Sequence, residues 1–75
     1  MAYYGHKSRA AWNVALWIAN DEGLYRTALD CIRRARGRGG RDAAARDLLA
    51  MLPERTPDGF RYTLTSVRAA LVGLE

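Results

Sequence analysis

The sequence predicts an all-α domain, a small bundle of three to four helices around a central, tryptophan-rich first helix. Three observations predict this fold class. Apolar residues recur at intervals of three and four through most of the chain, which is the spacing of one helix face. The breaks between these stretches carry residues that begin or end helices, and the only weakly alternating stretch is short. The 75 residues are expected to form one domain spanning 1–75.

The first helix is expected over residues 9–19, after Ser8, whose hydroxyl can accept a hydrogen bond from a first-turn amide. Because this helix is apolar over most of its circumference, we expect other elements to surround it. Trp12 is predicted to be buried and Trp17 partly exposed, and the two point roughly 140° apart, too far to form one stacking platform. The predicted inward residues are Ala11, Trp12, Ala15, Leu16 and Ala19, extended by Val14 and Ile18, whereas Arg9, Asn13 and Asn20 form a polar strip.

The second helix is expected over residues 22–36 and is the most clearly amphipathic segment. Asp21 can cap its start, and Asp30 is predicted to pair with Arg26 and Arg34, each four residues away. The glycines of residues 37–40 end the helix. Its predicted buried face comprises Leu24, Tyr25, Ala28, Leu29, Cys31, Ile32 and Ala35.

The third helix is expected over residues 42–52, where Pro53 stops it and Asp42 pairs with Arg46 on the outer side. Its predicted inward residues are Ala44, Ala45, Leu48, Leu49, Met51 and Leu52.

Turn chemistry and a last helix complete the chain. Residues 56–59, Thr-Pro-Asp-Gly, favour a turn, and residues 60–64 are predicted to be a short extended segment. Thr65 or Ser66 can then cap a short helix that ends at Leu74. Its inward residues are predicted to be Val67, Ala70, Leu71 and Leu74.

Positive charge is concentrated in one short segment. The net charge is +4, and Arg33, Arg34, Arg36, Arg38 and Arg41 lie close together without an acid among them. The remaining chain carries seven basic and eight acidic residues, so this segment holds all the excess. Because guanidinium groups pair two-pronged with phosphate or carboxylate, these arginines are a candidate binding site for phosphate or an acidic protein surface. A solvated loop whose charge only aids solubility is an equally open interpretation.

Catalytic, metal and cofactor sites are not predicted. His6 is the only histidine and Cys31 the only thiol, whereas a metal site needs several converging ligands. No nucleophile with a nearby base can be placed, and the glycines of residues 37–40 follow a helix instead of the strand that precedes a nucleotide loop. We therefore expect a protein that is not an enzyme and holds no cofactor.

The sequence predicts a cytoplasmic protein with no membrane association. A single cysteine forms no intramolecular disulfide, and the N-terminal residues lack the pattern of a signal peptide. The longest apolar run, residues 14–19, is too short to cross a bilayer.

Residues 12–25, Trp-Asn-Val-Ala-Leu-Trp-Ile-Ala-Asn-Asp-Glu-Gly-Leu-Tyr, resemble a motif of short, uncharacterised phage and prophage proteins. Members of that family open with a Tyr-Asn-Gly-Trp-like element and continue with Thr-Trp-Asn-Val-x-Leu-Trp-[Leu/Ile]-x-Asn-[Asp/Glu]-Glu-x-x-Tyr. The similarity covers residues 3–25, with a weaker echo at residues 56–59. Tyr4, His6 and Ala11 stand where the family has asparagine, tryptophan and threonine, so the N-terminal element is expected to pack or bind differently here.

The resemblance implies an origin in a phage or mobile element and assigns no reaction. In that context it suggests an accessory protein that binds and inhibits a host defence complex, an anti-CRISPR-like protein acting by stoichiometric contact. The arginine segment would then engage a host protein or the nucleic acid of a ribonucleoprotein complex.

Two alternative functions stay open. One is a small basic nucleic-acid-binding protein, whose affinity would fall steeply with salt. The other is a structural dimer formed through Trp17 or the last helix. The sequence does not decide between a monomer and a homodimer.

Overall fold

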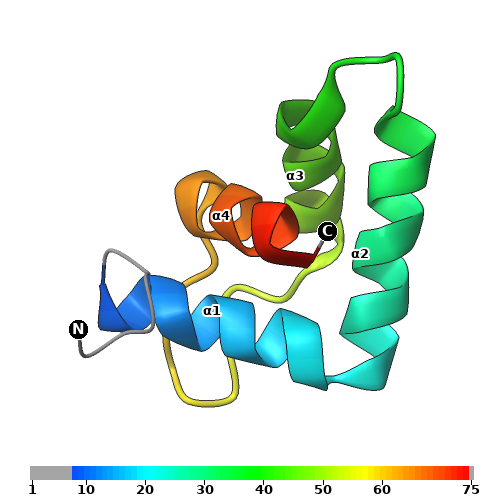
Figure 1. Cartoon of the computed structure of the whole chain (residues 1–75). Coiled ribbons are helices and arrows are strands. Elements are labelled where there is room, and N and C mark those ends of the chain that lie inside the picture. Colours follow the sequence, from blue (N-terminus) through cyan, green and yellow to red (C-terminus); the bar gives the residue numbers. More distant parts are fainter. Residues whose placement is uncertain (1–7, 75) are drawn as a thin grey trace.

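The structure, a computed structural model, describes residues 8–74 and folds them into four α-helices (Figure 1). These are α1 (Arg9–Asn20), α2 (Glu22–Ala35), α3 (Gly40–Met51) and α4 (Leu64–Leu74). The predicted all-α fold class is confirmed. The described residues contain no strand, only an isolated antiparallel bridge between Arg55 and Arg61. Of the extended segment predicted at residues 60–64, residues 60–63 lie outside any helix, with Arg61 in the bridge and the Tyr62 amide bonded to the Glu54 carbonyl. Leu64 was placed wrongly, because it already belongs to α4, which Thr63 caps.

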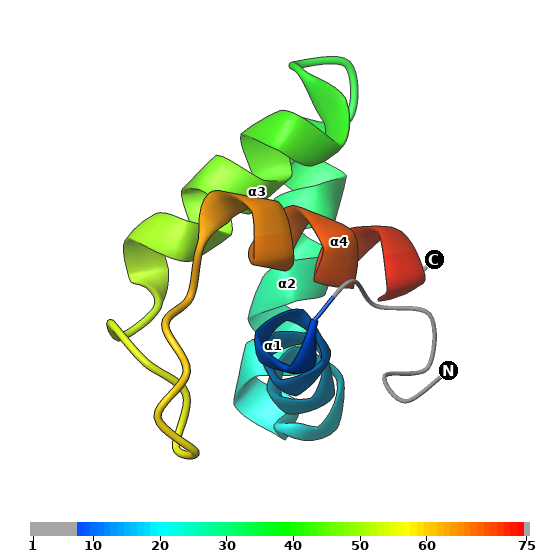
Figure 2. The ribbon, with the colours of Figure 1, turned by 90° about the vertical axis from the view of Figure 1, so that its left-hand side faces the viewer.

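The helix at the centre of the bundle is α4. It packs against α1, α3 and, less extensively, α2, and it lies between α1 and α3 (Figure 2). The first helix contacts α2 and α4 but not α3, so the expectation that the other helices surround it needs correction. The reason is the connectivity. Only Asp21 separates α1 from α2, α3 returns beside α2, and the long connection of residues 52–63 brings α4 into the space between α1 and α3.

The core is built from all four helices and Tyr62, which is 5% exposed. On α1 the buried apolar residues are Val14 and Ile18, both 0% exposed, whereas Leu16 is 37% exposed. Because α1 is apolar nearly all round, its hydrophobic periodicity could not determine which side faces inward. The other buried apolar residues are Ala28, Cys31, Ile32, Ala35, Ala44, Ala45, Leu48, Val67, Ala70 and Leu71.

Several side chains predicted to face inward are more exposed than expected. Tyr25 is 38% and Met51 53% exposed, Ala19 is exposed, and Trp12 is half-buried. Trp17 is half-buried, as predicted. Tyr25 and Met51 lie in the first turn of α2 and the last turn of α3, where fewer neighbouring elements are available to cover them.

The helix starts follow the predicted capping chemistry at two of four positions. Ser8 Oγ accepts a hydrogen bond from the Ala11 amide at 3.1 Å, and Asp21 Oδ1 accepts one from the Leu24 amide at 3.0 Å. At α4 the cap is Thr63 instead of Thr65 or Ser66, because its Oγ1 accepts from the Ser66 amide at 3.1 Å. The Thr63 amide in turn donates to Ser66 Oγ at 3.1 Å, which makes a reciprocal capping box.

Two ion pairs differ from those predicted. Asp30 pairs with Arg33 and Arg34, while Arg26 pairs with Glu22. Asp42 pairs with Arg68 of α4 and not with Arg46. A pair at helical spacing contributes only about 0.2–0.5 kcal/mol, so the spacing cannot select among partners on the same helix or exclude a partner such as Arg68 on another helix.

Candidate functional site

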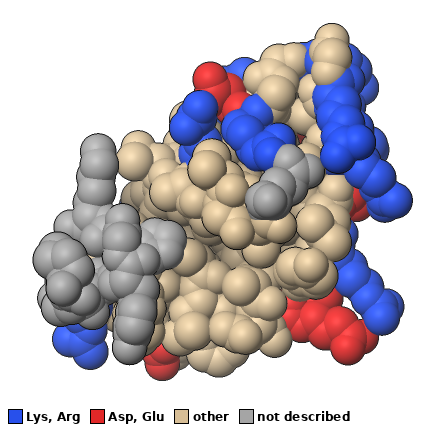
Figure 3. All heavy atoms as spheres, viewed as in Figure 1, with Lys and Arg blue, Asp and Glu red and all other residues tan. Residues whose placement is uncertain are grey.

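The five arginines of the predicted site lie at one end of the molecule, where α2 turns into α3. Arg33 and Arg34 are in the last turn of α2, Arg36 and Arg38 lie in the connection, and Arg41 is in the first turn of α3. We call this set the arginine corner. Arg41 is half-buried and the other four are exposed. The blue atoms at the upper right of Figure 3 cover this end of α2 and the turn.

Glycines give the corner its shape. Gly37, Gly39 and Gly40 have φ angles of 76°, 115° and 63°, which L-residues with side chains rarely adopt. A Cβ on Gly39 would also lie 2.9 Å from the Cβ of Ala43, closer than non-bonded carbon atoms approach each other in proteins. The turn therefore depends on glycine, and it gathers arginines from the end of one helix and the start of the next at one surface.

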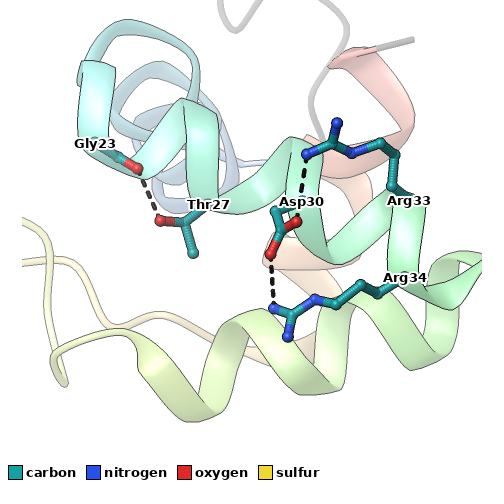
Figure 4. A network of polar contacts seen from close by, with 5 residues as sticks. All are labelled: Gly23, Thr27, Asp30, Arg33 and Arg34. Carbon is teal, nitrogen blue, oxygen red and sulfur yellow. Dashed lines mark hydrogen bonds and ion pairs between the residues drawn. The ribbon is translucent and has the colours of Figure 1, made fainter.

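Acidic side chains neutralise only part of the corner. Asp30 Oδ1 accepts a hydrogen bond from Arg33 Nη2 at 3.3 Å, and Asp30 Oδ2 forms an ion pair with Arg34 Nη2 at 3.0 Å, so one carboxylate serves two guanidinium groups (Figure 4). The Arg38 side chain makes no hydrogen bond or ion pair with any residue between 8 and 74. Exposed pairs of this kind contribute about 0–1 kcal/mol and leave most of the five N–H donors of each arginine available to a partner.

The helix dipoles account for some of these arginines and not for others. Arg33 and Arg34 lie at the C-terminal end of α2, where positive charge is favourable. Arg41 lies in the first turn of α3, where the dipole favours an acid, and its N-cap, Gly39, provides no side-chain hydrogen bond. Helix stability therefore explains two members of the corner and disfavours a third.

A second polar site, missed by the sequence reasoning, ties α1 to the connection of residues 52–63. Asp58 Oδ2 accepts hydrogen bonds from Asn13 Nδ2 at 2.8 Å and from Trp17 Nε1 at 2.9 Å. Thr56 Oγ1 donates to Asn13 Oδ1 at 2.8 Å and accepts from the Phe60 amide at 3.1 Å. We call this group the Asn13–Asp58 tie. Asn13 and Thr56 are each 4% exposed, so the tie closes over two buried polar side chains.

The Asn13–Asp58 tie stabilises the fold. Among the described residues no buried side-chain nitrogen or oxygen lacks a hydrogen-bond partner, so the buried amide of Asn13 and the buried hydroxyl of Thr56 are satisfied within the fold. Arg9 adds a stacking contact, with its guanidinium carbon 5.7 Å from the centroid of the Phe60 ring. Two features of the sequence point to this site. The spacing of Asn13 and Trp17 places them on one face of α1, and residues 56–59 form a turn.

Replacing Asn13 with alanine is expected to lower the free energy of unfolding by about 1–3 kcal/mol, because the buried Thr56 hydroxyl then loses its acceptor. Urea unfolding monitored by tryptophan fluorescence measures the change. Asn20→Ala is the matched control, since Asn20 is exposed and bonds only to the Leu16 carbonyl of its own helix. Equal effects of the two substitutions would contradict the role given to the tie.

Stability should also depend on the charge of Asp58. Hydrogen bonds from Asn13 and then Trp17, with a smaller contribution from Arg9, hold the pKa of the Asp58 carboxyl below its ordinary value. A lowered pKa in the folded state stabilises the protein above the unfolded pKa, about 3.9 for Asp, and this contribution is lost as the pH falls through the folded value. The urea midpoint of the wild type should therefore fall more on acidification than that of Asp58→Asn. Parallel pH profiles would contradict the assignment.

The remaining features offer little chemistry. A groove of about 540 Å³ lies between the N-terminal ends of α1 and α4. Of its polar side chains, Ser8, Thr63 and Ser66 serve in helix caps and Arg68 pairs with Asp42. Burial raises the pKa of the Cys31 thiol. Within residues 8–74 no three His, Cys, Asp or Glu side chains meet in a group that could hold a metal ion. None of the four described helices is long and apolar enough to cross a membrane.

Comparison with known protein families matches residues 1–72 to a family of unknown function, DUF7249. The chain belongs to this family. The match includes α1, α2, α3, most of α4, the arginine corner and both halves of the Asn13–Asp58 tie. No curated protein and no solved structure shows significant similarity to the chain.

Proposed function

We propose that the protein is a non-enzymatic accessory protein of phage origin that binds a host defence complex of the CRISPR type and inhibits it by stoichiometric contact. The arginine corner is its binding surface. The observation that carries this proposal is the concentration of five guanidinium groups around one glycine turn, where Arg33, Arg34 and Arg38 are all exposed.

A binding role explains the composition of the corner better than solubility does. Solubility requires charge anywhere on the surface, whereas here the excess charge is confined to one turn. Arg41 lies at a helix end that disfavours positive charge, and Arg38 has no ion-pair partner among the described residues. Such an arrangement is suited to an external partner that supplies carboxylate or phosphate oxygens.

The nature of the target follows from the resemblance of residues 12–25 to short phage and prophage proteins. Small proteins of such elements act on the host by binding, and defence ribonucleoproteins present both acidic protein surfaces and phosphates. In this proposal the rigid bundle presents the corner, and attachment blocks a surface that the defence complex needs.

The proposal is tested by expressing the tagged protein in a bacterium with an active CRISPR system and recovering its partners with and without nuclease. We expect a defence-complex subunit that survives nuclease treatment and that the variant Arg33→Gln/Arg38→Gln fails to recover. The matched control, Arg26→Gln/Arg46→Gln, removes two exposed charges from outside the corner and should recover the subunit normally. Recovery of no defence subunit by the wild type would contradict the proposal.

A second candidate function is direct binding of nucleic acid, favoured by the same cluster of arginines. It differs in its salt dependence, because each phosphate contact to a double helix contributes a slope of about −0.9 to the plot of log affinity against log salt. Recovery of nucleic acid alone, lost on nuclease treatment or at high salt, would favour this function over the first.

A further inference from the structure

An Asp-Gly pair, Asp58 and Gly59, lies in the connection between α3 and α4, and both residues are exposed. A carboxyl side chain followed by glycine is prone to ring closure, because a residue without a Cβ lets its backbone nitrogen approach the preceding side chain. Asp58 is the only aspartate that glycine follows, and neither asparagine of the chain precedes a glycine. The chain therefore has one position where this chemistry is favoured.

The reaction rearranges the backbone with water as the only other participant. The Gly59 nitrogen attacks Cγ of the protonated Asp58 carboxyl group, the N–Cγ bond forms, and the hydroxyl leaves with the amide proton as water. A second water molecule then opens the succinimide ring. Addition at Cγ restores aspartate, whereas addition at the former backbone carbonyl carbon gives isoaspartate, in which the chain continues through Cγ. The mass of the product equals that of the starting chain.

The Asn13–Asp58 tie holds the carboxyl group in a state that resists this attack. Asp58 Oδ2 accepts hydrogen bonds from Asn13 Nδ2 at 2.8 Å and from Trp17 Nε1 at 2.9 Å, so two donors of α1 fix its orientation. Both bonds favour the ionised form and hold the pKa of the carboxyl below its ordinary value. An ionised carboxylate has no hydroxyl to release as water, so it reacts poorly.

The nitrogen that would attack is also restrained. The Gly59 amide donates to the Thr56 carbonyl at 2.8 Å, so the proton that must leave is hydrogen-bonded within the turn. The Gly59 carbonyl accepts from Arg55 Nη1 at 3.1 Å. Thr56 is in turn bonded to Asn13 through its hydroxyl and to the backbone of Phe60. The tie and its turn therefore hold both reacting groups.

We propose that Asp58–Gly59 is a latent modification site, where isoaspartate forms spontaneously unless the Asn13–Asp58 tie holds the turn closed. Isoaspartate adds one carbon to the backbone and attaches the carboxylate directly to Cα, so the bonds to Asn13 and Trp17 are lost. The buried Asn13 amide then lacks an acceptor, which destabilises the folded state. The site would thus limit the lifetime of the folded protein, and it is independent of the arginine corner and of the proposed function.

Incubation of the purified wild type at neutral pH, with isoaspartate measured over time in the tryptic peptide 56–61, tests the proposal. Trypsin cleaves after Arg55 and Arg61, and liquid chromatography separates the aspartate and isoaspartate forms of this peptide. The same chain unfolded in concentrated urea supplies the unrestrained rate. We expect the folded protein to form isoaspartate at least about tenfold more slowly, since loss of one hydrogen bond to a charged group is enough for that factor.

Two substitutions distinguish the tie from the stability of the fold as a whole. Trp17→Phe removes the Nε1 donor to Asp58 and should raise the rate in the folded protein about threefold to tenfold. Ile32→Val is the matched control, because it removes one buried methyl group from α2 and lowers the free energy of unfolding modestly without touching the tie. Its rate should stay within about twofold of the wild type, since the turn opens locally.

Equal rates in the folded and urea-unfolded chains, or equal rates in Trp17→Phe and Ile32→Val, would overturn the role of the tie. Absence of isoaspartate from the unfolded chain would overturn the site itself. The modification also has a structural signature, because a second Trp17 Nε1–H signal should appear in the nuclear magnetic resonance spectrum as isoaspartate accumulates. A single, unchanged Trp17 signal in a modified sample would contradict the loss of the tie.

Discussion

Replacing Leu71 with alanine is expected to lower the free energy of unfolding by about 2–5 kcal/mol, the range for a large-to-small substitution in a packed core. Leu71 is 0% exposed and lies on α4, which packs extensively against both α1 and α3 and also contacts α2. A domain this small has a total stability near the lower end of the usual range, about 5 kcal/mol, so the variant should be partly unfolded at room temperature. Circular dichroism and urea titration measure the loss.

The matched substitution is Leu16→Ala on α1. The same atoms are removed, but Leu16 is 37% exposed, so the expected cost is smaller, about 1 kcal/mol. The pair of variants distinguishes a bundle centred on α4 from the one expected from sequence, centred on α1. A larger loss for Leu16→Ala than for Leu71→Ala would contradict the observed packing.

Neutralising the arginine corner is expected to have the largest effect on binding. Hydrogen bonds to charged groups contribute about 1.5–3 kcal/mol each, so loss of one contact weakens binding about tenfold or more. The variant Arg33→Gln/Arg38→Gln should therefore bind the recovered partner about a hundredfold more weakly than the wild type. Surface plasmon resonance or calorimetry with the purified partner measures the ratio.

The control for this prediction is Arg26→Gln/Arg46→Gln, which changes the net charge by the same amount. Arg26 and Arg46 are exposed on α2 and α3, but neither belongs to the corner. The affinity of this control variant for the partner should stay within about threefold of that of the wild type, since distant surface charges act mainly on the rate of encounter. Equal losses for the two variants would mean that net charge, and not the corner, determines binding.

Local features of the fold were predictable from sequence. The start of α1 after Ser8 and the start of α2 after Asp21 follow from side chains that accept hydrogen bonds from first-turn amides. The buried face of α2 was predicted at Ala28, Cys31 and Ile32 because one side of that helix is apolar and the other is charged. Where one face of a helix is apolar and the opposite face is charged, the sequence predicts which of its residues are buried.

Long-range features were not predictable. On α1 the apolar residues leave little contrast between faces, so Leu16 was placed inward and Asn13 outward, whereas the structure has the reverse. Asn13 is buried because Thr56 and Asp58 satisfy its amide, and those partners lie more than forty residues away in the chain. Local periodicity does not encode such a contact. For the same reason, the central position of α4 could not be predicted from the sequence.

The arginine corner could be predicted from the sequence because its five members lie close together in the chain, within residues 33–41. A turn between two helices brings residues 33–41 to one end of the molecule whatever the rest of the fold does. The ion pairs of the arginine corner could not be predicted. Whether Asp30 pairs with Arg33 or with Arg26 depends on side-chain rotamers, which the spacing of the residues does not determine.

Both proposed functions place binding at the arginine corner, and nuclear magnetic resonance of the wild type locates the surface that an anionic ligand contacts. Isotope-labelled protein would be titrated separately with a short DNA duplex and with polyglutamate, which supply phosphate and carboxylate. We expect the amide and arginine Nε signals of residues 33–41 to shift most with at least one of these anions, while the signals of the exposed residues of α1 and α4 stay unchanged. Shifts centred on another surface, or no shift with either anion, would contradict it.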